Sequence, residues 1–344
     1  MKIMRGLATG IGSLPYHDAE EALELIFKYV PFAPFWPQLP RRDVREGMIA
    51  QFSEHLPCLK IKEGEFVFDP SDKENELEKF YDRVIAADTD YFAMSKEFSE
   101  GFYKFHQYLE ATGAPKAEFL KCHVTGPFTF CAGVNDERGN SLLHDEVFMQ
   151  AAVKGLAMKA LWQLDILSKF GKKMIIFLDE PYLAAVGSAY TTVNRETVVS
   201  MLSETVEMIK SKDCLLGVHC CGNTDWSMLT DIPGLDIISF DAFNFQDRFV
   251  LYADDLKRFF KNGGVACWGI VPTQDGTAGL TAQMLAQKIN SGVEALVKKG
   301  LERNLLLDRL MISPACGLGT LDPQETLGVF KLLSQTSELI AKKP

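Results

Sequence analysis

The chain has 344 residues, of which 47% are hydrophobic and 24% charged, as is usual for a soluble globular protein with a large core. Its formal net charge of -10 argues against the clustered basic surface that nucleic-acid binding requires, so no nucleic-acid partner is expected. The sequence has no apolar run of about 18 residues and no signal-peptide pattern at its start, so we expect no membrane partner and a cytoplasmic location.

Short apolar runs that end in polar, Gly or Pro residues alternate along the chain with segments of helical periodicity. The runs predict strands near residues 5–11, 33–38, 118–124, 174–179, 215–219, 236–240, 265–270 and 309–313. The periodic segments predict helices over Ala19 to Tyr29, Asp145 to Phe170, Arg195 to Lys210, Ala253 to Lys261, Thr281 to Lys299 and Pro323 to Ala341. Eight strands alternating with helices favour an α/β fold of the closed (β/α)8 TIM-barrel type over an open doubly wound sheet.

The segment from about 43 to 115 is too long for a single strand–helix unit. We therefore predict one catalytic domain over residues 1–344, with a partly helical insertion at about 43–115, after the second strand. The charge-rich stretch at 72–79 lies in this insertion, and it is predicted to be a solvated helix face rather than an acidic binding site.

Eight cysteines are scattered through the chain without the dense spacing of a secreted disulfide framework. Reduced thiols are therefore expected. In that setting, a cysteine beside a histidine more often marks a metal or catalytic site than a crosslink, which directs attention to residues 219–221.

Metal-binding side chains follow several predicted strands, where the active sites of such barrels lie. His219 and Cys221 are two residues apart in an extended segment, so both point to one side and can bind one ion, whereas Cys220 faces away. Cys316 follows the last strand and Asp241 the sixth, which makes them candidates for the third and fourth zinc ligands. Because these ligands come from separate strands, they favour a catalytic zinc over a structural one, although a His-x-Cys pair alone also arises by chance.

Two carboxylates, Asp179 and Glu180, directly follow the buried run MIIFL. One of them is expected to face the pocket, where it suits a cationic amine. The alternative is a local structural role, because Asp-Glu-Pro also fits the start of a helix with Pro181 in its first turn.

Four motifs occur in a characteristic order: GIGSLP at 10–15, LDEP at 178–181, HCC at 219–221 and PACGL at 314–318. In this order they resemble the C-terminal catalytic barrel of cobalamin-independent methionine synthase, in its short core form, and the resemblance covers nearly the whole chain. HCCGN at 219–223 is also similar to the motif of zinc methyltransferases that act with corrinoid proteins. Both groups share the uroporphyrinogen decarboxylase-like barrel.

The resemblance implies a zinc ion held by His219, Cys221 and Cys316, with Asp241 standing where the family has Glu. It also implies a catalytic part for Asp241, as a weak ligand that the substrate sulfur displaces.

For the substrate, the resemblance implies that Ile11, Gly12 and Ser13 hold the carboxylate of homocysteine and that Asp179 binds its ammonium group and orients it for catalysis. A further homocysteine-binding Glu of the family has only a positional candidate, Glu46.

Several folate-binding residues of the family are missing. Ala132 and Gly133 stand where a Trp is expected, residues 184–186 replace a Glu, and CWGIVPT at 267–273 lacks the proton-donating His. A methylcobalamin donor leaves without needing a proton, whereas methyltetrahydrofolate requires protonation of its leaving nitrogen. The expected methyl donor is therefore methylcobalamin or a protein-bound methyl-corrinoid, with a corrinoid protein as a possible partner.

The sequence thus predicts an S-methyltransferase that activates homocysteine as a thiolate on zinc and forms methionine. Another small thiol such as coenzyme M remains open as the substrate. A decarboxylase on the same barrel is a second alternative, with cationic candidates Arg5, Arg41, Arg42 and Arg45, and a non-catalytic corrinoid- or metal-binding module is a third. Four aromatic residues are candidates for a corrinoid pocket, although such residues more often belong to the core: Phe32, Phe35, Trp36 and Trp268.

Overall fold

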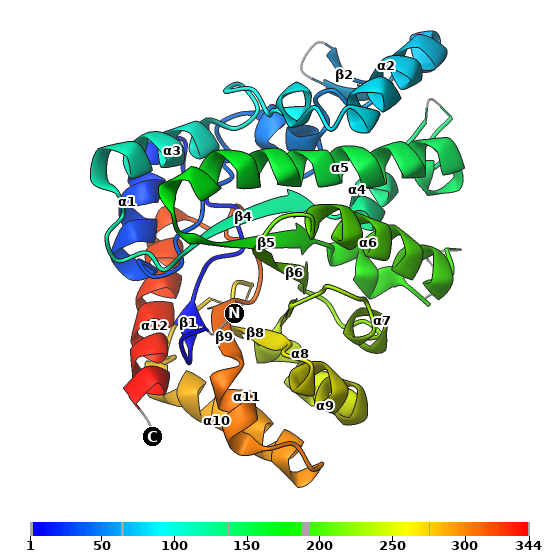
Figure 1. Ribbon diagram of the computed structural model, residues 1–344. Helices are drawn as coiled ribbons and strands as arrows, with labels where there is room; N and C mark the ends of the chain where they lie inside the picture. The colour runs from blue at the N-terminus through cyan, green and yellow to red at the C-terminus, as the bar shows by residue number, and fades with distance from the viewer. Residues whose placement is uncertain (1–2, 63–64, 137, 188–192, 275, 343–344) are drawn as a thin grey trace.

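The computed structural model describes residues 3–62, 65–136, 138–187, 193–274 and 276–342. Within these residues a sheet of seven parallel strands curls into a barrel wall (Figure 1). Its strands, in spatial order, are β1 (Leu7–Ala8), β9 (Leu310–Pro314), β8 (Val265–Val271), β7 (Ile237–Phe240), β6 (Cys214–Cys220), β5 (Lys173–Asp179) and β4 (Phe119–Thr125). The seven correspond to seven of the eight predicted strands.

The remaining predicted strand, at 33–38, lies between β1 and β4 and is joined to the chain on each side by a single bridge. Phe35 pairs with Lys121 of β4, and Gln38 pairs with Ser13 just beyond β1. The chain here contains Pro34 and Pro37, which have no N–H to give to a ladder. The segment therefore occupies the eighth position without forming a regular strand, and the TIM-barrel-like fold predicted from the sequence is confirmed.

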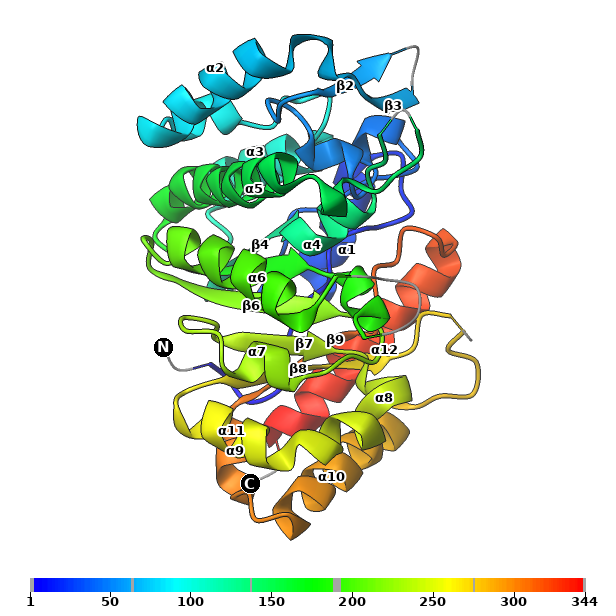
Figure 2. The same ribbon diagram turned by 90° about the vertical axis from the view of Figure 1, so that its right-hand side faces the viewer.

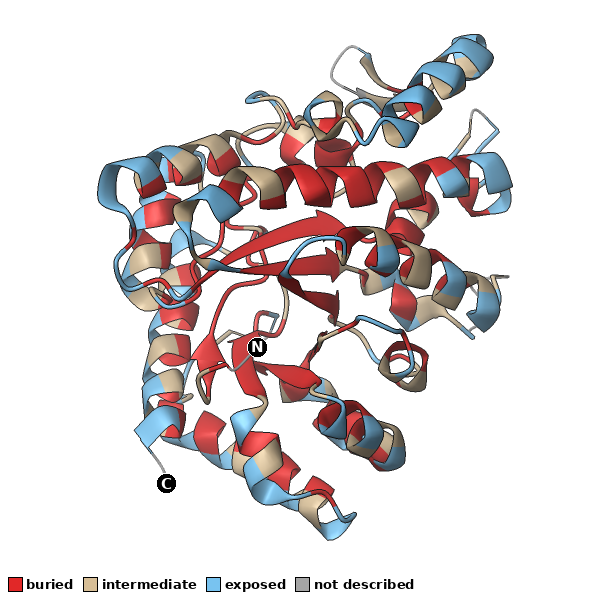
Figure 3. Ribbon diagram, in the orientation of Figure 1, coloured by how far each residue is buried: buried red, intermediate tan, exposed pale blue. Residues whose placement is uncertain are grey.

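Helices cover the outside of the wall, and their exposed faces point away from the buried strands (Figure 3). The six predicted helices are present as α1 (Ala19–Tyr29), α5 (Glu146–Leu167), α6 (Arg195–Ile209), α9 (Ala253–Lys261), α10 (Ala282–Lys298) and α12 (Pro323–Lys342). Short helices add to them: α4 (Pro127–Ala132), α7 (Ser227–Thr230), α8 (Ala242–Phe249) and α11 (Arg303–Asp308). The helix α5 begins after Asp145, whose side chain caps it by accepting a hydrogen bond from the Phe148 N–H.

The segment 43–115 contains a hairpin of β2 (Leu59–Lys62) and β3 (Glu65–Phe68), followed by α2 (Lys73–Ile85) and α3 (Glu100–Thr112). In both ribbon views the hairpin and α2 lie on the far side of α5 from the sheet (Figure 2). Most side chains of 72–79 are exposed or half-buried, which agrees with a solvated helix face.

The inside of the barrel is filled by apolar side chains from alternate positions of the strands, including Phe119, Ile175, Phe177 and Ile237. Gly217 leaves room for Phe177, because a Cβ at that position would lie 2.6 Å from the Phe177 ring. This packed layer is the floor beneath the polar side chains at the strand ends. No helix in the described residues has the length and apolar character needed to cross a membrane.

Candidate metal and substrate site

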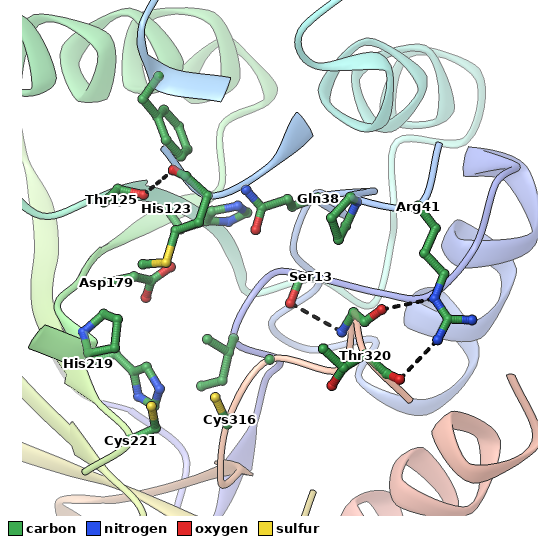
Figure 4. Close-up of a pocket in the computed structure, with 17 residues that line it drawn as sticks. Ser13, Gln38, Arg41, His123, Thr125, Asp179, His219, Cys221, Cys316 and Thr320 are labelled. Atoms are coloured by element: carbon green, nitrogen blue, oxygen red, sulfur yellow. Dashed lines mark hydrogen bonds between the residues drawn. The ribbon is translucent and has the colours of Figure 1, made fainter. Parts of the chain in front are cut away.

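A cavity of about 640 Å³ opens at the C-terminal ends of the strands (Figure 4). Its lining combines polar and sulfur-bearing side chains from the strand ends with loop residues of the N-terminal and C-terminal segments. The residues that line it are Ile11, Ser13, Gln38, Pro40, Arg41, Met48, Phe52, His123, Thr125, Asp179, Pro181, His219, Cys221, Cys316, Gly317, Gly319 and Thr320. The cavity therefore lies at the end of the barrel where the sequence predicted the site.

Three of the four predicted zinc ligands converge on this cavity. One ligand atom each of His219, Cys221 and Cys316 lies within 4.8 Å of the others. The Nε2 atom of His219 is buried and has no hydrogen-bond partner among the described residues. An orphaned imidazole nitrogen beside two thiols is a donor set that fits zinc. Cys220 points away into the outer core, as predicted.

The thiols of Cys221 and Cys316 interact directly. This interaction, together with His219, lowers the pKa of Cys316. The pKa of Cys221 is raised by the same contact and by burial. The interaction thus favours the thiolate form of Cys316, which is the form that binds a metal.

His219 is oriented by a neighbouring strand. Its Nδ1 lies 3.0 Å from Oγ of Ser239, the residue that pairs with it on β7. This contact holds the ring so that Nε2 faces the thiols, in the way that outer partners commonly fix metal-binding histidines.

Asp241 is not part of the group formed by the other three. Its Oδ1 accepts a hydrogen bond from the Asn244 backbone N–H, and its Oδ2 accepts one from the Asn244 side chain, so it caps α8. Burial raises its pKa, and the nearby Cys316 adds to the rise. Its part as a fourth ligand that substrate displaces stays a prediction.

The two carboxylates after β5 have separate places. Asp179 lines the cavity, and its Oδ1 is buried without a partner in the described part of the chain. Burial raises its pKa to about 6, against the opposing effect of Lys121. Glu180 is buried away from the cavity and accepts hydrogen bonds from the backbone N–H groups of Phe128 and Thr129. The cavity thus receives one carboxylate, and the other supports α4.

Hydrogen bonds from two other parts of the chain hold the Ile11–Ser13 segment in place. The buried amine of Lys121 donates a hydrogen bond of 2.5 Å to the Ile11 carbonyl, and the backbone carbonyl of Ser13 accepts one from Leu318. Gly317 packs closely against this segment, because a Cβ there would lie 2.2 Å from Oγ of Ser13. The loop that follows Cys316 and the predicted substrate segment are therefore locked together.

Other sequence-based candidates lie elsewhere. Glu46 is buried outside the cavity lining, where it accepts hydrogen bonds from Leu39 N–H and from Arg42. These contacts occupy both oxygens of the Glu46 carboxylate, so it is not placed to bind the substrate. Phe35, Trp36 and Trp268 are core residues, and Phe32 is exposed outside the cavity lining.

The structure adds residues that the sequence did not single out. His123, Gln38 and Met48 line the cavity, and the Met48 carbonyl accepts a hydrogen bond from Thr125. His123 stands at a strand end, which was a signal for it. Gln38 and Met48 come from irregular chain, so neither periodicity nor a motif marked them.

A barrel with a metal-competent group at its C-terminal rim defines the general class of the protein. No protein-family model matches the sequence, and no curated protein matches it significantly. Its structure is similar to that of a B12-independent methionine synthase from Shewanella sp. W3-18-1 in complex with selenomethionine, with a TM-score of 0.61, 16% identity and 98% of both chains covered. It is also similar to a putative vitamin-B12 independent methionine synthase from Listeria monocytogenes, with a TM-score of 0.52, 14% identity, and 99% of this chain and 98% of that one covered. These similarities establish the fold.

Proposed function

We propose that this protein is a zinc-dependent methyltransferase that converts homocysteine to methionine. The observation that carries the proposal is the group of His219, Cys221 and Cys316 in a cavity that also contains Asp179. The two similar structures, one of a B12-independent methionine synthase and one of a putative B12-independent methionine synthase, support it.

The cavity suits a small amino acid with a thiol at one end. The thiol end of the substrate would lie at His219, Cys221 and Cys316, and Asp179 offers a carboxylate to its ammonium group. When zinc is bound, it lowers the pKa of a coordinated thiol, so that the sulfur is a nucleophile near neutral pH. The residues of the site then contribute orientation, which holds the sulfur in line with the methyl group.

In the transfer itself, the substrate thiol loses its proton and its sulfur forms a bond to the methyl carbon. The bond between the methyl group and the donor breaks at the same time, and its electron pair stays with the donor. Several positions at which the resemblance implies folate-binding residues carry other residues here, among them Ala132 and Ala184. On this ground we propose methylcobalamin or a methyl-corrinoid as the donor, with methyltetrahydrofolate as the alternative, since the similar structures belong to enzymes named as B12-independent.

The test is to measure zinc content and methionine formation from homocysteine with each donor. About one zinc per chain and methionine from either donor would support the proposal. Equal activity after complete removal of the metal would overturn it. Methionine from methyltetrahydrofolate alone would reject the corrinoid donor but keep the reaction.

The alternatives fit the cavity less well. A decarboxylase of this fold would need several cations for the carboxylates of its substrate, yet Arg41 is the one Lys or Arg among the described residues that line the cavity. Arg42 and Arg45 form ion pairs with Glu46 and Asp43. Coenzyme M carries a sulfonate and no ammonium, so Asp179 would repel it.

A further inference from the structure

His123 is a buried polar side chain whose ring nitrogens are both unused. His123 is only 1% exposed, and neither Nδ1 nor Nε2 of its ring has a hydrogen-bond partner among the described residues. Buried polar atoms are nearly always paired, so such a ring needs an explanation. It lines the same cavity as Asp179 and the thiols, so a bound ligand is the natural partner.

The position of the ring is fixed by its neighbours. It stacks on Trp36 with ring centroids 3.9 Å apart and planes 17° apart. The Trp36 indole donates a hydrogen bond to Gln163, and the Gln163 side chain donates one to the His123 carbonyl. The ring is therefore held by stacking and by its backbone, while its nitrogens are left for another molecule.

The Nε2 edge faces the predicted substrate segment. A Cβ at Gly12 would lie 3.0 Å from Nε2 and 2.9 Å from Cε1 of His123, so this edge lies directly against the Gly12 backbone. In Figure 4 His123 lies above Cys221 and Cys316 in the pocket, with Asp179 between them in this view. An amino acid whose sulfur is at the thiols would reach His123 with its other end.

The neutral ring offers one N–H donor, and the nearby Lys121 amine favours an anion as its partner. Burial, assisted by Lys121, lowers the pKa of His123 well below its usual range, so the ring is neutral and carries one N–H. Lys121 lies beneath this layer, with its amine 4.6 Å from the centre of the Phe177 ring. A neutral N–H above a buried amine suits a carboxylate better than an ammonium group.

Gln38, which also lines the cavity, offers a hydrogen-bond acceptor where His123 offers a donor. Its amide nitrogen donates to Gln51, whose own amide nitrogen donates to the Phe98 carbonyl, so the direction of this chain is fixed. Oε1 of Gln38 accepts no hydrogen bond from the described residues and is left as an acceptor at the cavity, like the carboxylate of Asp179.

We propose that His123 is a specificity-determining residue that donates a hydrogen bond from its ring to the carboxylate of the amino-acid substrate, while Gln38 and Asp179 accept from its ammonium group. This inference rests on the proposed function, because it takes the substrate to be an amino acid. It makes His123 a selector for substrates with a carboxylate.

The experiment compares the binding of methionine, decarboxylated methionine and deaminated methionine by calorimetry. His123→Phe keeps the stacking on Trp36 but removes the N–H. We expect it to weaken methionine and deaminated methionine roughly 10- to 100-fold, as loss of a hydrogen bond to a charged group does. Decarboxylated methionine should change by less than about twofold, and His123→Gln, which retains a donor, should recover part of the loss.

The control is His106→Phe on α3, outside the cavity, which should leave all three affinities unchanged. Thermal unfolding and zinc content of each variant show whether the fold and metal group are intact. In the wild type, the His123 ring resonances in nitrogen NMR should move with methionine and with deaminated methionine.

Equal loss for all three ligands, or loss only for those with an amine, would overturn the role of His123 while leaving the methyltransferase in place. The role of His123 would also be overturned if the wild type forms methionine and the His123→Phe variant binds methionine as tightly as the wild type does. A wild type that binds none of the ligands and forms no methionine would instead overturn the proposed function, and this inference with it.

Discussion

The two ends of the cavity are built in different ways. At the thiol end, His219 and Cys221 come from one strand end and Cys316 from another, and a single neighbour, Ser239, orients the imidazole. At the opposite end, His123 is positioned by stacking on residues of distant segments.

The difference teaches which chemistry each end can support. The thiol end has strong, exchangeable donors close together, which is what metal binding and sulfur activation need. The other end offers a donor from His123 and acceptors from Gln38 and Asp179, which discriminate between ligands without reacting with them. Changes at the first end should therefore abolish the reaction, and changes at the second should alter which thiol is used.

The largest effect is expected from Cys316→Ser or Cys221→Ser. A serine hydroxyl stays protonated and is a poor zinc ligand, so zinc should be lost and methyl transfer should fall by roughly 1000-fold or more. Metal analysis and a methionine assay measure both. Cys220→Ala is the matched control, because Cys220 points into the outer core and should keep its zinc. Full activity in either serine variant would show that these thiols are not the ligands.

A smaller and selective effect is expected from Asp179→Asn. It removes the carboxylate offered to the ammonium group, so KM for homocysteine should rise by about 10- to 100-fold. A thiol of similar length without an amino group should be affected by less than about threefold. An equal change for both thiols, measured by steady-state kinetics, would remove this role from Asp179.

Ser239→Ala tests how the imidazole is held. Without the contact of 3.0 Å to Nδ1, His219 can rotate, and zinc affinity should fall by about tenfold. Competition with a chelator measures this loss. If zinc affinity stays at the wild-type value, packing alone fixes the ring.

The sequence predicted the thiol end better than the other end for a physical reason. Residues at strand ends of a parallel barrel meet at one rim, so His219, Cys221 and Cys316 were predicted together from strand positions and a motif. The same reasoning predicted that Asp179 or Glu180 faces the pocket, and the family resemblance gave that place to Asp179. The predicted helices also agree with the structure, because amphipathic periodicity and caps are local signals.

The other end depends on contacts that no local pattern records. The segment 33–38 was predicted as a strand, yet its prolines leave only single bridges to its neighbours, and Gln38 reaches the cavity from this irregular chain. Glu46 was a candidate by position, but it is occupied by Arg42 and by backbone N–H groups. Which polar side chain is used within the fold and which is left free is decided by packing between distant segments.

The smallest expected effect concerns stability and again separates binding from folding. In the metal-free protein the pKa of Asp179 is raised to about 6 from an unfolded value of 3.8, so the folded state holds its proton more tightly. The resulting stability is fully present below the unfolded pKa and is lost as pH rises through about 6. Asp179→Asn has no such loss. Because water in the cavity screens the Asp179 carboxylate, the variant should gain about 1 kcal/mol of stability near pH 7.5.

Relative to the wild type, Tm of the variant should therefore be higher by about 2 °C near pH 7.5, and this difference should shrink as pH falls toward 4. Thermal unfolding of the two chelator-treated proteins across this range measures the trend. The control Glu97→Gln, at an exposed residue outside the cavity, should show no such pH-dependent difference in Tm. A difference that stays constant with pH would mean that Asp179 is already charged at low pH. A stabilised variant that binds homocysteine poorly would show that the cavity keeps a carboxylate which weakens the fold because the ligand needs it.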